Sequence, residues 1–456
     1  MQVDIDVRYE TFVPANVKKH IATILETIQN AGGECYLVGG SVRDLLLGYS
    51  PKEYDFTTSL HPEQIQKLFK RVFATGIEHG TVTVLLDNIS YEVTSFRSES
   101  EYVDGRRPEK VEFGVSLEED LKRRDFTFNA FAYSPNTSRN SKSVFYDLHS
   151  GIVDLEQKRI RTIGDPIERF TEDGLRPIRA IRFTSQLGFA IEEKTWEAIA
   201  SCKSITAKVS VERVSAELEK IFLTPKPLTS LDLFLEFGFI DLFWKQKHLY
   251  ADGAEKEPYG SSFDSQMQLG FIDQFFLHPT QKDLSLFWFL FLWKILKRVP
   301  DSKAVSDFSK SLKLSRQKIS EMELYSKIFQ ALLTNFPKNL FAFKKEILFP
   351  ILKFQNLRTS ENPFLLTIQT YFVFLKSGNF ITGESLEFLE VFLQNPSVPI
   401  VLSDLVINGD SILRRYPKID KTQIGKILQE CLELVWEFPE GNTELAIWKK
   451  IEERMS

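Results

Sequence analysis

The order of strand-like and helix-like segments is the feature that most constrains the fold of this chain. Over roughly the first 150 residues, apolar runs of strand length alternate with helical patterns. CYLVGG (35–40) has the character of a buried strand ending in a glycine turn, and SVRDLLLG (41–48) that of a short helix stopped by Gly48. From about residue 160 onward the apolar spacing is helical, as in VERVSAELEKIF (211–222) and KEILFPILKF (345–354). The chain is predicted to be a small α/β head followed by a long helical body.

The rest of the head carries strand and turn signals. YDFTT (54–58) is predicted to be extended, and HPEQIQKLF (61–69) to be a helix opened by Pro62. GTVTVLL and ISYEVTSF are predicted to pair as a hairpin through an Asp87-Asn88 turn. These segments would form the sheet of the head.

Size and cysteine content bound the class of protein. A chain of 456 residues is too long for one compact core, so several domains are expected. Its 43% hydrophobic and 26% charged residues are ordinary for a soluble protein. Cys35, Cys202 and Cys431 are far apart and odd in number, which indicates neither a disulfide framework nor a cysteine-rich metal site. A reducing, cytoplasmic location follows.

Membrane segments are not expected. The first residues, MQVDIDVRYETFVP, lack the basic and apolar regions of a signal peptide. The most apolar run, LSLFWFLFLW (284–293), is too short to span a bilayer and is followed by Lys294. No membrane partner is therefore predicted.

Charge gives two opposing indications about nucleic acid. The net charge of −5 argues against a nucleic-acid partner. Residues 301–360, however, hold eleven Lys and Arg against five Asp and Glu. A solvated helical face explains such a balance equally well. The candidate RNA-binding side chains within it are Lys310, Lys313, Arg316 and Lys318.

Two carboxylates lie two positions apart in SPKEYDFTTS (50–59). Strand alternation would put Glu53 and Asp55 on one face, about 6–7 Å apart along the backbone. An isolated pair of this kind is usually a solvated edge strand. The spacing also suits divalent cations that bridge a substrate phosphate. Glu92, in ISYEVTSFR, would join the pair if its strand is a neighbour, and an outward-facing glutamate is the equal alternative.

A glycine turn precedes the carboxylates. LVGGSVRD places Gly39 and Gly40 before a helix that carries Arg43, without the pattern of a dinucleotide fingerprint or a P-loop. Backbone N–H groups at such a turn can approach a phosphate, and Arg43 can add a charge-assisted contact. A Gly-Gly turn by itself is more often only a tight turn.

Three further groups follow in the chain. The second lies on a turn, and the last sets an Asp and Arg residues on one helical face, where an acceptor beside a forked donor can match the pairing edge of a base. Surface ion pairing is the alternative for any single group of this kind. The groups are Arg123, Arg124, Asp125 and Asn129 in RRDFTFNA; Asp147, Gly151 and Asp154 in YDLHSGIVDL; and Asp173, Arg176, Arg179 and Arg182, predicted as a stripe on one side of a helix, in EDGLRPIRAIRF.

As an ordered set these motifs resemble those of bacterial class II tRNA nucleotidyltransferases, the CCA-adding enzymes of the polymerase β superfamily. The resemblance runs from about residue 33 to 220 and includes VERVSAELEKIF. It implies an α/β nucleotidyltransferase (polymerase β-like) head followed by an all-helical neck, body and tail. The implied domains are a catalytic head at 1–157, a base-recognition neck at 158–226, and a tRNA-binding body and tail at 227–456.

The resemblance also implies roles for individual residues. Glu53 and Asp55 would hold Mg²⁺ in a two-metal site, with Glu92 as a third catalytic carboxylate. Asp173 and Arg176 would read the incoming base, so that protein replaces a nucleic-acid template. ATP and CTP would be the substrates and tRNA the partner. The implied nucleotide-binding residues are Gly39, Gly40, Arg43, Arg123, Arg124, Asp125, Asn129, Asp173, Arg176, Arg179 and Arg182.

Two positions depart from the family pattern. The family usually has Asp at position 53, and Glu53 moves the carboxylate by about 1.5 Å, which octahedral Mg²⁺ tolerates poorly. Pro177 follows Arg176 within the arginine stripe, where proline disfavours a helix. The helix must therefore begin later than the stripe suggests or be kinked.

Related activities stay open at the level of sequence. Poly(A) polymerases share most of these motifs, although NAFAY and EDGLR are closer to CCA-adding enzymes, and an enzyme that adds only the terminal A is another possibility. An RNA-binding protein with a decayed site is the non-enzymatic alternative. The segment 97–114 resembles the flexible loop that such enzymes need for the final A. None of the six histidines precedes an aspartate, so no phosphohydrolase domain is expected.

Overall fold

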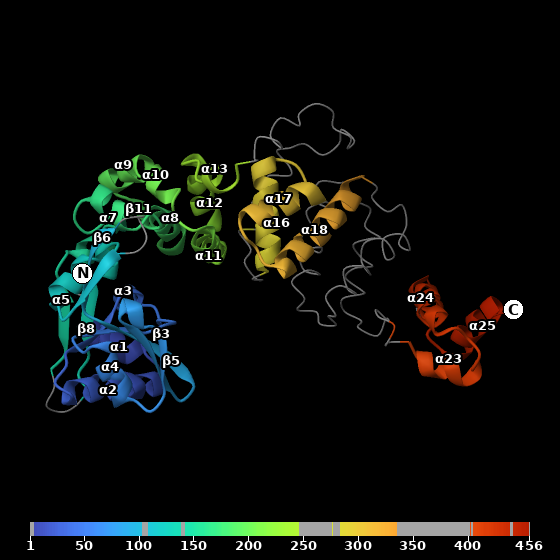
Figure 1. Cartoon of the computed structure of the whole chain (residues 1–456), viewed down its shortest axis with the longest axis horizontal. Coiled ribbons are helices and arrows are strands. Elements are labelled where there is room, and N and C mark those ends of the chain that lie inside the picture. The colour runs from blue at the N-terminus through green and yellow to red at the C-terminus, as the bar shows by residue number, and fades with distance from the viewer. Residues whose placement is uncertain are drawn as a thin grey trace. The chain divides into compact units, whose positions relative to one another are not determined.

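The structure is a computed structural model that divides into two compact units, Met1–Phe243 and Trp244–Ser456 (Figure 1). Division of the first unit into a head at 1–157 and a neck at 158–226 stays a prediction. The residues that the structure describes are 4–102, 108–137, 142–245, 276, 283–334, 402, 405–437 and 441–455.

A mixed sheet forms the centre of the head. Its strands follow the order β3-β4-β5-β2-β1-β8-β9, and the β2–β5 pair is parallel while the other neighbours are antiparallel. The predicted strands at 35–40 and 54–58 are confirmed as β1 and β2. The bounds are β1 Cys35–Val38, β2 Asp55–Thr58, β3 Val72–Gly76, β4 Thr81–Leu86, β5 Ile89–Ser95, β8 Phe131–Ser134 and β9 Val144–Asp147.

The predicted hairpin of β4 and β5 is confirmed. Asp87 and Asn88 both adopt positive φ, at 46° and 65°. Two consecutive residues in this region make the turn whose twist matches that of antiparallel strands. The turn fixes the register, so that Thr83 pairs with Glu92.

Helices cover this sheet. In α2 (Ala15–Asn30), Ile21, Ile24, Leu25 and Ile28 are fully buried at helical spacing, and the helix contacts β1. The predicted helix start at Pro62 is confirmed, because Pro62 is its first residue. The other helices of the head are α1 Ile5–Phe12, α3 Gly40–Leu47, α4 Pro62–Leu68, α5 Leu117–Lys122 and α6 Gly151–Glu156, with short 3-10 turns at Ile77–His79 and Thr127–Asn129.

A separate hairpin lies within the segment that resembles a flexible loop. Its strands are β6 (Arg97–Tyr102) and β7 (Pro108–Phe113). The ring of Phe113 packs edge-on against His61, at 5.8 Å between ring centroids. It also covers Gly80, where φ is 73° and a Cβ would lie 2.4 Å from the ring. Glycine is therefore needed at this contact.

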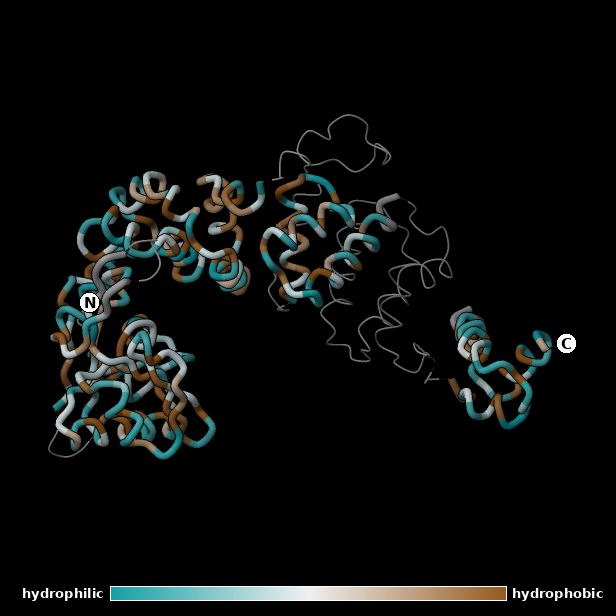
Figure 2. The backbone as a smooth tube through the Cα atoms, in the orientation of Figure 1, coloured by the Kyte–Doolittle hydropathy of each residue, from teal (hydrophilic) through white to brown (hydrophobic). Residues whose placement is uncertain are grey.

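The remainder of the first unit is helical, as predicted. Hydrophobic and hydrophilic residues alternate along these helices, as the brown and teal bands in Figure 2 show. VERVSAELEKIF forms one helix, α11. The elements are α7 Pro166–Glu172, α8 Arg176–Leu187, α9 Glu193–Ser201, α10 Lys203–Thr206, α11 Val211–Phe222, α12 Pro227–Glu236 and α13 Ile240–Phe243, with β10 Arg159–Ile160 paired to β11 Ala190–Ile191.

The second unit is helical in its described part. The apolar run at 284–293 forms most of α16 (Leu284–Leu296), and its Trp288 packs against Phe308 of α17 (Ser302–Ser311). Within the described ranges, no helix has both the length and the apolar character needed to cross a bilayer. The other helices are α18 Arg316–Thr334, α23 Gly409–Arg415, α24 Lys421–Glu437 and α25 Glu444–Met455; the predicted helix in KEILFPILKF lies outside the described residues.

Candidate active site

The parallel pairing of β2 and β5 brings two of the predicted carboxylates together. Phe56 pairs with Val93, so Asp55 and Glu92 occupy the preceding positions of neighbouring strands. Glu53 is exposed and lies just before β2, while the intervening Tyr54 is buried. Alternation therefore puts Glu53 and Asp55 on the same side of the segment, as predicted, although Glu53 itself is outside the strand.

Asp55 is the electrostatic centre of this group. Burial raises the pKa of Asp55, repulsion from Glu92 and Glu53 raises it further, and the attraction of Arg124 opposes these effects; the resulting pKa is about 6. The raised pKa shows that the positive charge near the Asp55 carboxylate does not balance its burial and the neighbouring negative charges. A cation bound here would supply that charge.

The residues present fit Mg²⁺. Among the described residues, no three His, Cys, Asp or Glu side chains are grouped closely enough to hold a metal by themselves. Mg²⁺, however, is typically held by one or two carboxylates together with the phosphates of a substrate. Asp55 and Glu53 match that pattern, because one is half-buried among like charges and the other is exposed beside it.

The glycine turn lies at the end of the adjacent strand. β1 leads through Gly39, with φ 70° and ψ −134°, into the N-terminus of α3. L-residues with a Cβ rarely adopt this backbone conformation, so glycine is required at position 39. Val38 pairs with Asp55, which places the turn next to the carboxylates.

The guanidinium group of Arg124 lies beside this glycine turn. A Cβ at Gly39 would lie 3.4 Å from Nη1 of Arg124. The Arg124 side chain is 18% exposed, its Nη2 is 3.5 Å from the Asp120 carboxylate, and its Nε has no hydrogen-bond partner among the described residues. Burial lowers the pKa of this guanidinium, which nonetheless stays charged. A buried cation with spare donors beside a glycine turn can bind phosphate.

A chain of polar contacts joins α3 to α8. Arg43 donates from Nη1 to Asn129 Oδ1 at 2.8 Å, and Asn129 donates to Asp125 Oδ1 at 3.3 Å. Arg179 donates from Nη2 to Asp125 Oδ2 at 2.6 Å. Burial by itself would raise the pKa of Asp125, but Arg179 and Arg176 outweigh it and lower the pKa to about 2. These predicted nucleotide-binding residues are therefore brought together.

The prediction that Asp173 shares a helix with the arginine stripe is wrong. Asp173 caps the C-terminus of α7, and α8 begins only at Arg176. Pro177 consequently lies in the first turn of α8, where its missing N–H costs no helical hydrogen bond. The later helix start, rather than a kink, is the alternative that the structure confirms.

Asp173 and Arg176 have separate partners. Asp173 accepts from the Leu175 N–H and, at 2.8 Å, from Arg213 of α11. Arg176 is 9% exposed at its side chain and donates to Glu172 and to the carbonyl oxygens of Arg169 and Arg123. Asp173 remains about one quarter exposed, so it is accessible to a ligand.

Arg123 and Arg182 have mainly structural contacts. Arg123 forms an ion pair with Asp120 at 2.7 Å. Arg182 pairs with Glu217 and Gln186, and its guanidinium lies 4.2 Å from the centroid of the Phe183 ring. Nucleotide binding by these two arginines stays a prediction, and their contacts indicate that they support the site.

Sequence reasoning missed Asp120 and Arg213. Asp120 lies in EEDLKRRD beside two other acids, and nothing in the pattern distinguishes the buried one. Arg213 belongs to the motif VERVSAELEKIF and is the third residue of α11, the helix that packs on α8. Its place in the first turn of a predicted helix within this motif could have identified it.

In the second unit, the four candidate RNA-binding side chains follow one another around the α17–α18 connection. Lys310 lies in the last turn of α17, Lys313 lies in the connection, and Arg316 and Lys318 lie in the first turn of α18. Lys310, Lys313 and Arg316 are exposed and Lys318 is half-buried. Their contact with RNA stays a prediction.

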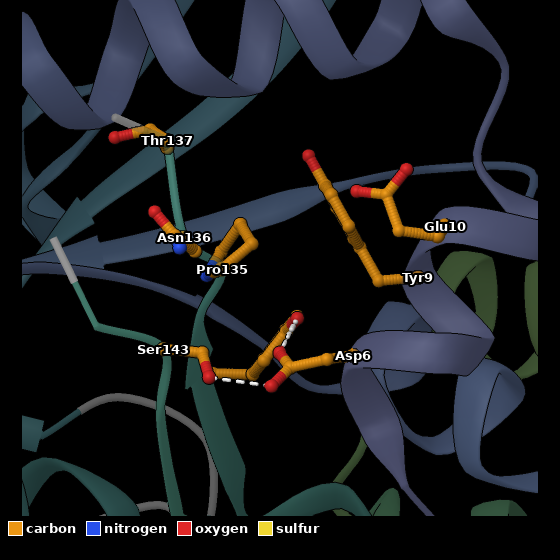
Figure 3. Close-up of a pocket in the computed structure, with 8 residues that line it drawn as sticks. Asp6, Tyr9, Glu10, Pro135, Asn136, Thr137 and Ser143 are labelled. Atoms are coloured by element: carbon orange, nitrogen blue, oxygen red, sulfur yellow. Dashed lines mark hydrogen bonds between the residues drawn. The ribbon is translucent and has the colours of Figure 1, made fainter. Parts of the chain in front are cut away.

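The head also contains a pocket that none of the predicted site residues lines. It lies between α1 and the segment after β8 (Figure 3). The Asp6 carboxylate accepts hydrogen bonds from the hydroxyls of Tyr133 and Ser143, at 2.6 and 2.5 Å. Both oxygens of the Asp6 carboxylate thus accept hydrogen bonds from the protein. These bonds fix α1 to β8 and to the segment before β9, and they do not indicate a second ligand-binding site.

Comparison with known proteins agrees with the geometry. The model of the poly A polymerase head domain matches residues 35–161. The model described as the probable RNA and SrmB-binding site of polymerase A matches residues 188–246. A CCA-adding enzyme of Levilactobacillus brevis is 40% identical over 312 residues, which cover 68% of this chain and 72% of that protein. The chain belongs to the CCA-adding enzyme family.

The match to other members of the family is shorter. The CCA-adding enzyme of Lactobacillus helveticus is 48% identical over 213 residues, which are 47% of this chain. The matched part spans about half of that relative, 52% of its length.

Solved structures extend the likeness along the chain. The Bacillus stearothermophilus CCA-adding enzyme in complex with CTP has a TM-score of 0.66 and 28% identity, covering 96% of this chain and 98% of that chain. A Thermotoga maritima CCA-adding enzyme complexed with tRNA has a TM-score of 0.60 at 20% identity and supports the fold alone. The predicted fold class, an α/β nucleotidyltransferase head followed by helical parts, is confirmed.

Asp55 should make the free energy of unfolding of the metal-free protein decrease as the pH rises. Its folded pKa of about 6 lies above the ordinary value of 3.8, so its ionisation costs folding free energy above pH 6 and costs nothing below about pH 3.8. Asp55→Asn should therefore be more stable than wild type at pH 8, by roughly 1–3 kcal/mol, and equal to it near pH 4. Urea unfolding in EDTA at both pH values measures this, and an equal gap at the two pH values would contradict it.

Proposed function

We propose that this protein adds C, C and A to the 3′ end of tRNA, using CTP and ATP and releasing pyrophosphate. The observation that carries the proposal is the Asp55–Glu92 pair next to the Gly39 turn that faces Arg124. Acidic groups that repel one another, beside a guanidinium whose Nε has no hydrogen-bond partner among the described residues, suit a metal-bound triphosphate. We place this reaction in the cytoplasm, on the basis of the composition.

The reaction would join the terminal tRNA hydroxyl to the α-phosphorus of the nucleotide. The new P–O bond forms as the bond to the β-phosphate breaks, and pyrophosphate leaves with those electrons. Glu53 and Asp55 would hold Mg²⁺, which supplies charge neutralisation and activation of the hydroxyl. Glu92, the carboxylate that would not hold the metal, would take up the proton of the hydroxyl.

The arginines would bind and orient the nucleotide. Arg124 and the Gly39-Gly40 backbone would contact the triphosphate, and Arg43 would support them through Asn129. Asp173 would accept a hydrogen bond from the exocyclic amine of cytosine or adenine. The contact from Arg213, at 2.8 Å, orients this carboxylate.

Addition of only the terminal A is the second candidate. It would use the same carboxylates and the same triphosphate contacts, so the geometry of the head does not separate the two. Poly(A) synthesis would add many A residues without CTP. Purified protein should be given tRNA ending in the discriminator base, in CC or in CCA, with single labelled nucleotides; incorporation of C on the first substrate selects CCA addition.

Asp55→Ala should abolish nucleotide incorporation while tRNA binding persists, because a ligand of the metal is lost and the RNA contacts are elsewhere. Incorporation into tRNA and affinity for tRNA should be measured side by side. Glu63→Ala, a change of an exposed acid on α4, is the control and should keep wild-type turnover. An Asp55→Ala protein that retains more than about a tenth of the turnover would exclude metal binding by Asp55.

Asp173→Ala should relax nucleotide choice. UTP and GTP present a carbonyl where Asp173 needs a donor, which costs about 1–3 kcal/mol or more. The variant should admit UTP or GTP as competitors while total activity falls. Asp165→Ala removes the cap of α7 and is the control for stability, with selection unchanged. Unchanged discrimination by the Asp173 variant would assign base reading to another group.

The basic cluster should provide contacts to phosphate that do not depend on sequence. Neutralising Lys310, Lys313, Arg316 and Lys318 together should weaken tRNA binding and flatten its salt dependence, by about one unit or less of log–log slope per lost contact. Neutralising the exposed Lys19, Lys67 and Lys70 of the head is the control. An unchanged slope would mean that the cluster is only a solvated face.

A further inference from the structure

Asp120 is a fully buried carboxylate in a helix whose other two acidic residues are exposed. It lies in α5, where its side chain is 0% exposed while its neighbours Glu118 and Glu119 face solvent. A capping box between Ser116 and Glu119 fixes the start of this helix. Asp120 therefore has a set position on the inner face of α5.

The two oxygens of Asp120 bind groups from three other parts of the head. Oδ1 accepts from Arg123, at 2.7 Å from Nη2, and from the backbone N–H of Arg97 at 3.4 Å. Oδ2 accepts from the Thr57 hydroxyl at 3.1 Å and lies 3.5 Å from Nη2 of Arg124. A single carboxylate thus joins α5, β2, β6 and the segment after α5.

These partners connect Asp120 to the candidate active site and to the β6–β7 hairpin. Thr57 is two residues beyond Asp55 on β2, and Arg124 faces the Gly39 turn. Arg97 is the first residue of the β6–β7 hairpin, and its carbonyl accepts from Nε of Arg123 at 3.1 Å. Both backbone polar atoms of Arg97 are therefore held by the Asp120–Arg123 pair.

The charge balance makes Arg124 depend on Asp120. Burial would raise the pKa of Asp120, but the guanidinium groups of Arg123 and Arg124 outweigh it and hold the pKa below its ordinary value. Without this anion, two guanidinium groups would face each other with little solvent. Among the described residues, the contact with Asp120 is the only hydrogen bond made by the Arg124 side chain, and its Nε has no partner.

We propose that Asp120 is a positioning residue of the nucleotide site, which holds Arg124 against the Gly39 turn and fixes the base of the β6–β7 hairpin. The proposal rests on the assignment of this turn to the triphosphate. It assigns no contact between Asp120 and substrate. It predicts that Asp120 affects recognition of the triphosphate and the order of the hairpin together.

Asp154 provides a matched control in the same head. It is also 0% exposed and accepts from two arginines and a threonine, Arg159 at 2.7 Å, Arg161 at 2.8 Å and Thr127 at 2.6 Å. None of these partners is assigned to the nucleotide site. A role in folding alone would make the two aspartates equivalent.

The test compares Asp120→Asn with Asp154→Asn in the full chain. With Mg²⁺ present, Asp120→Asn should lower affinity for ATP at least tenfold and leave affinity for AMP within about twofold, because only ATP has the triphosphate. Asp154→Asn should leave the ratio of the two affinities unchanged. Equal ratios in both variants, or tighter ATP binding by Asp120→Asn, would overturn the proposal.

Hydrogen exchange gives a second readout. The amides of β6 and β7 should exchange at least tenfold faster in Asp120→Asn and at the wild-type rate in Asp154→Asn. If Asp120→Asn does not fold, Asp120→Glu decides, since it keeps the charge and moves it by one methylene. Asp120→Glu should lower the ATP-to-AMP affinity ratio at least threefold, and an unchanged ratio overturns the proposal.

The proposed function and this inference fail in different ways. A wild-type protein that binds ATP but extends no tRNA contradicts the function and leaves the comparison of affinities intact. A wild-type protein that extends tRNA, together with an Asp120→Asn variant of unaltered ATP affinity, contradicts the positioning role alone.

Discussion

Parallel pairing of β2 with β5 is the constraint on which the site depends. It places Asp55 and Glu92 at adjacent positions of neighbouring strands, where their repulsion helps to raise the pKa of Asp55. Backbone hydrogen bonds hold the carboxylates together against that repulsion. Positive charge beside the two carboxylates would relieve their repulsion. The Gly39 turn and Arg124 lie next to them, so a metal-bound triphosphate could bind there and its metal would supply that charge.

A second set of charges connects the sheet to the helices that follow it within the first unit. Asp125 accepts from Arg179 of α8 and from Asn129, which binds Arg43 of α3. Since Asp125 is buried and strongly acidic, Arg179 cannot leave it without exposing an uncompensated charge. A continuous chain of contacts therefore joins the phosphate side of the proposed site to the base-reading side.

Local pattern was enough to predict much of the fold and part of the site. The strand-turn-helix at Gly39, the Asp87-Asn88 hairpin and α11 follow from residue types a few positions apart. The separation of Asp173 from α8 did not, because helix spacing in EDGLR continues across the break after Glu172. Asp120 could not be selected either, since its partner Thr57 is 63 residues away and burial is a property of the assembled head.

The position of Glu53 makes a longer side chain compatible with the proposed metal site. The first residue pair of β2 with β1 is Asp55 with Val38, so Glu53 lies before the ladder begins. The backbone at Asp55 is fixed by this pairing and by the neighbouring β5, and an extra methylene there would displace the carboxylate from the Gly39 turn. The exposed segment at Glu53 has no such pairing and can move to compensate for the added length. Substitution of Asp by Glu is therefore easier to accommodate at position 53 than at position 55.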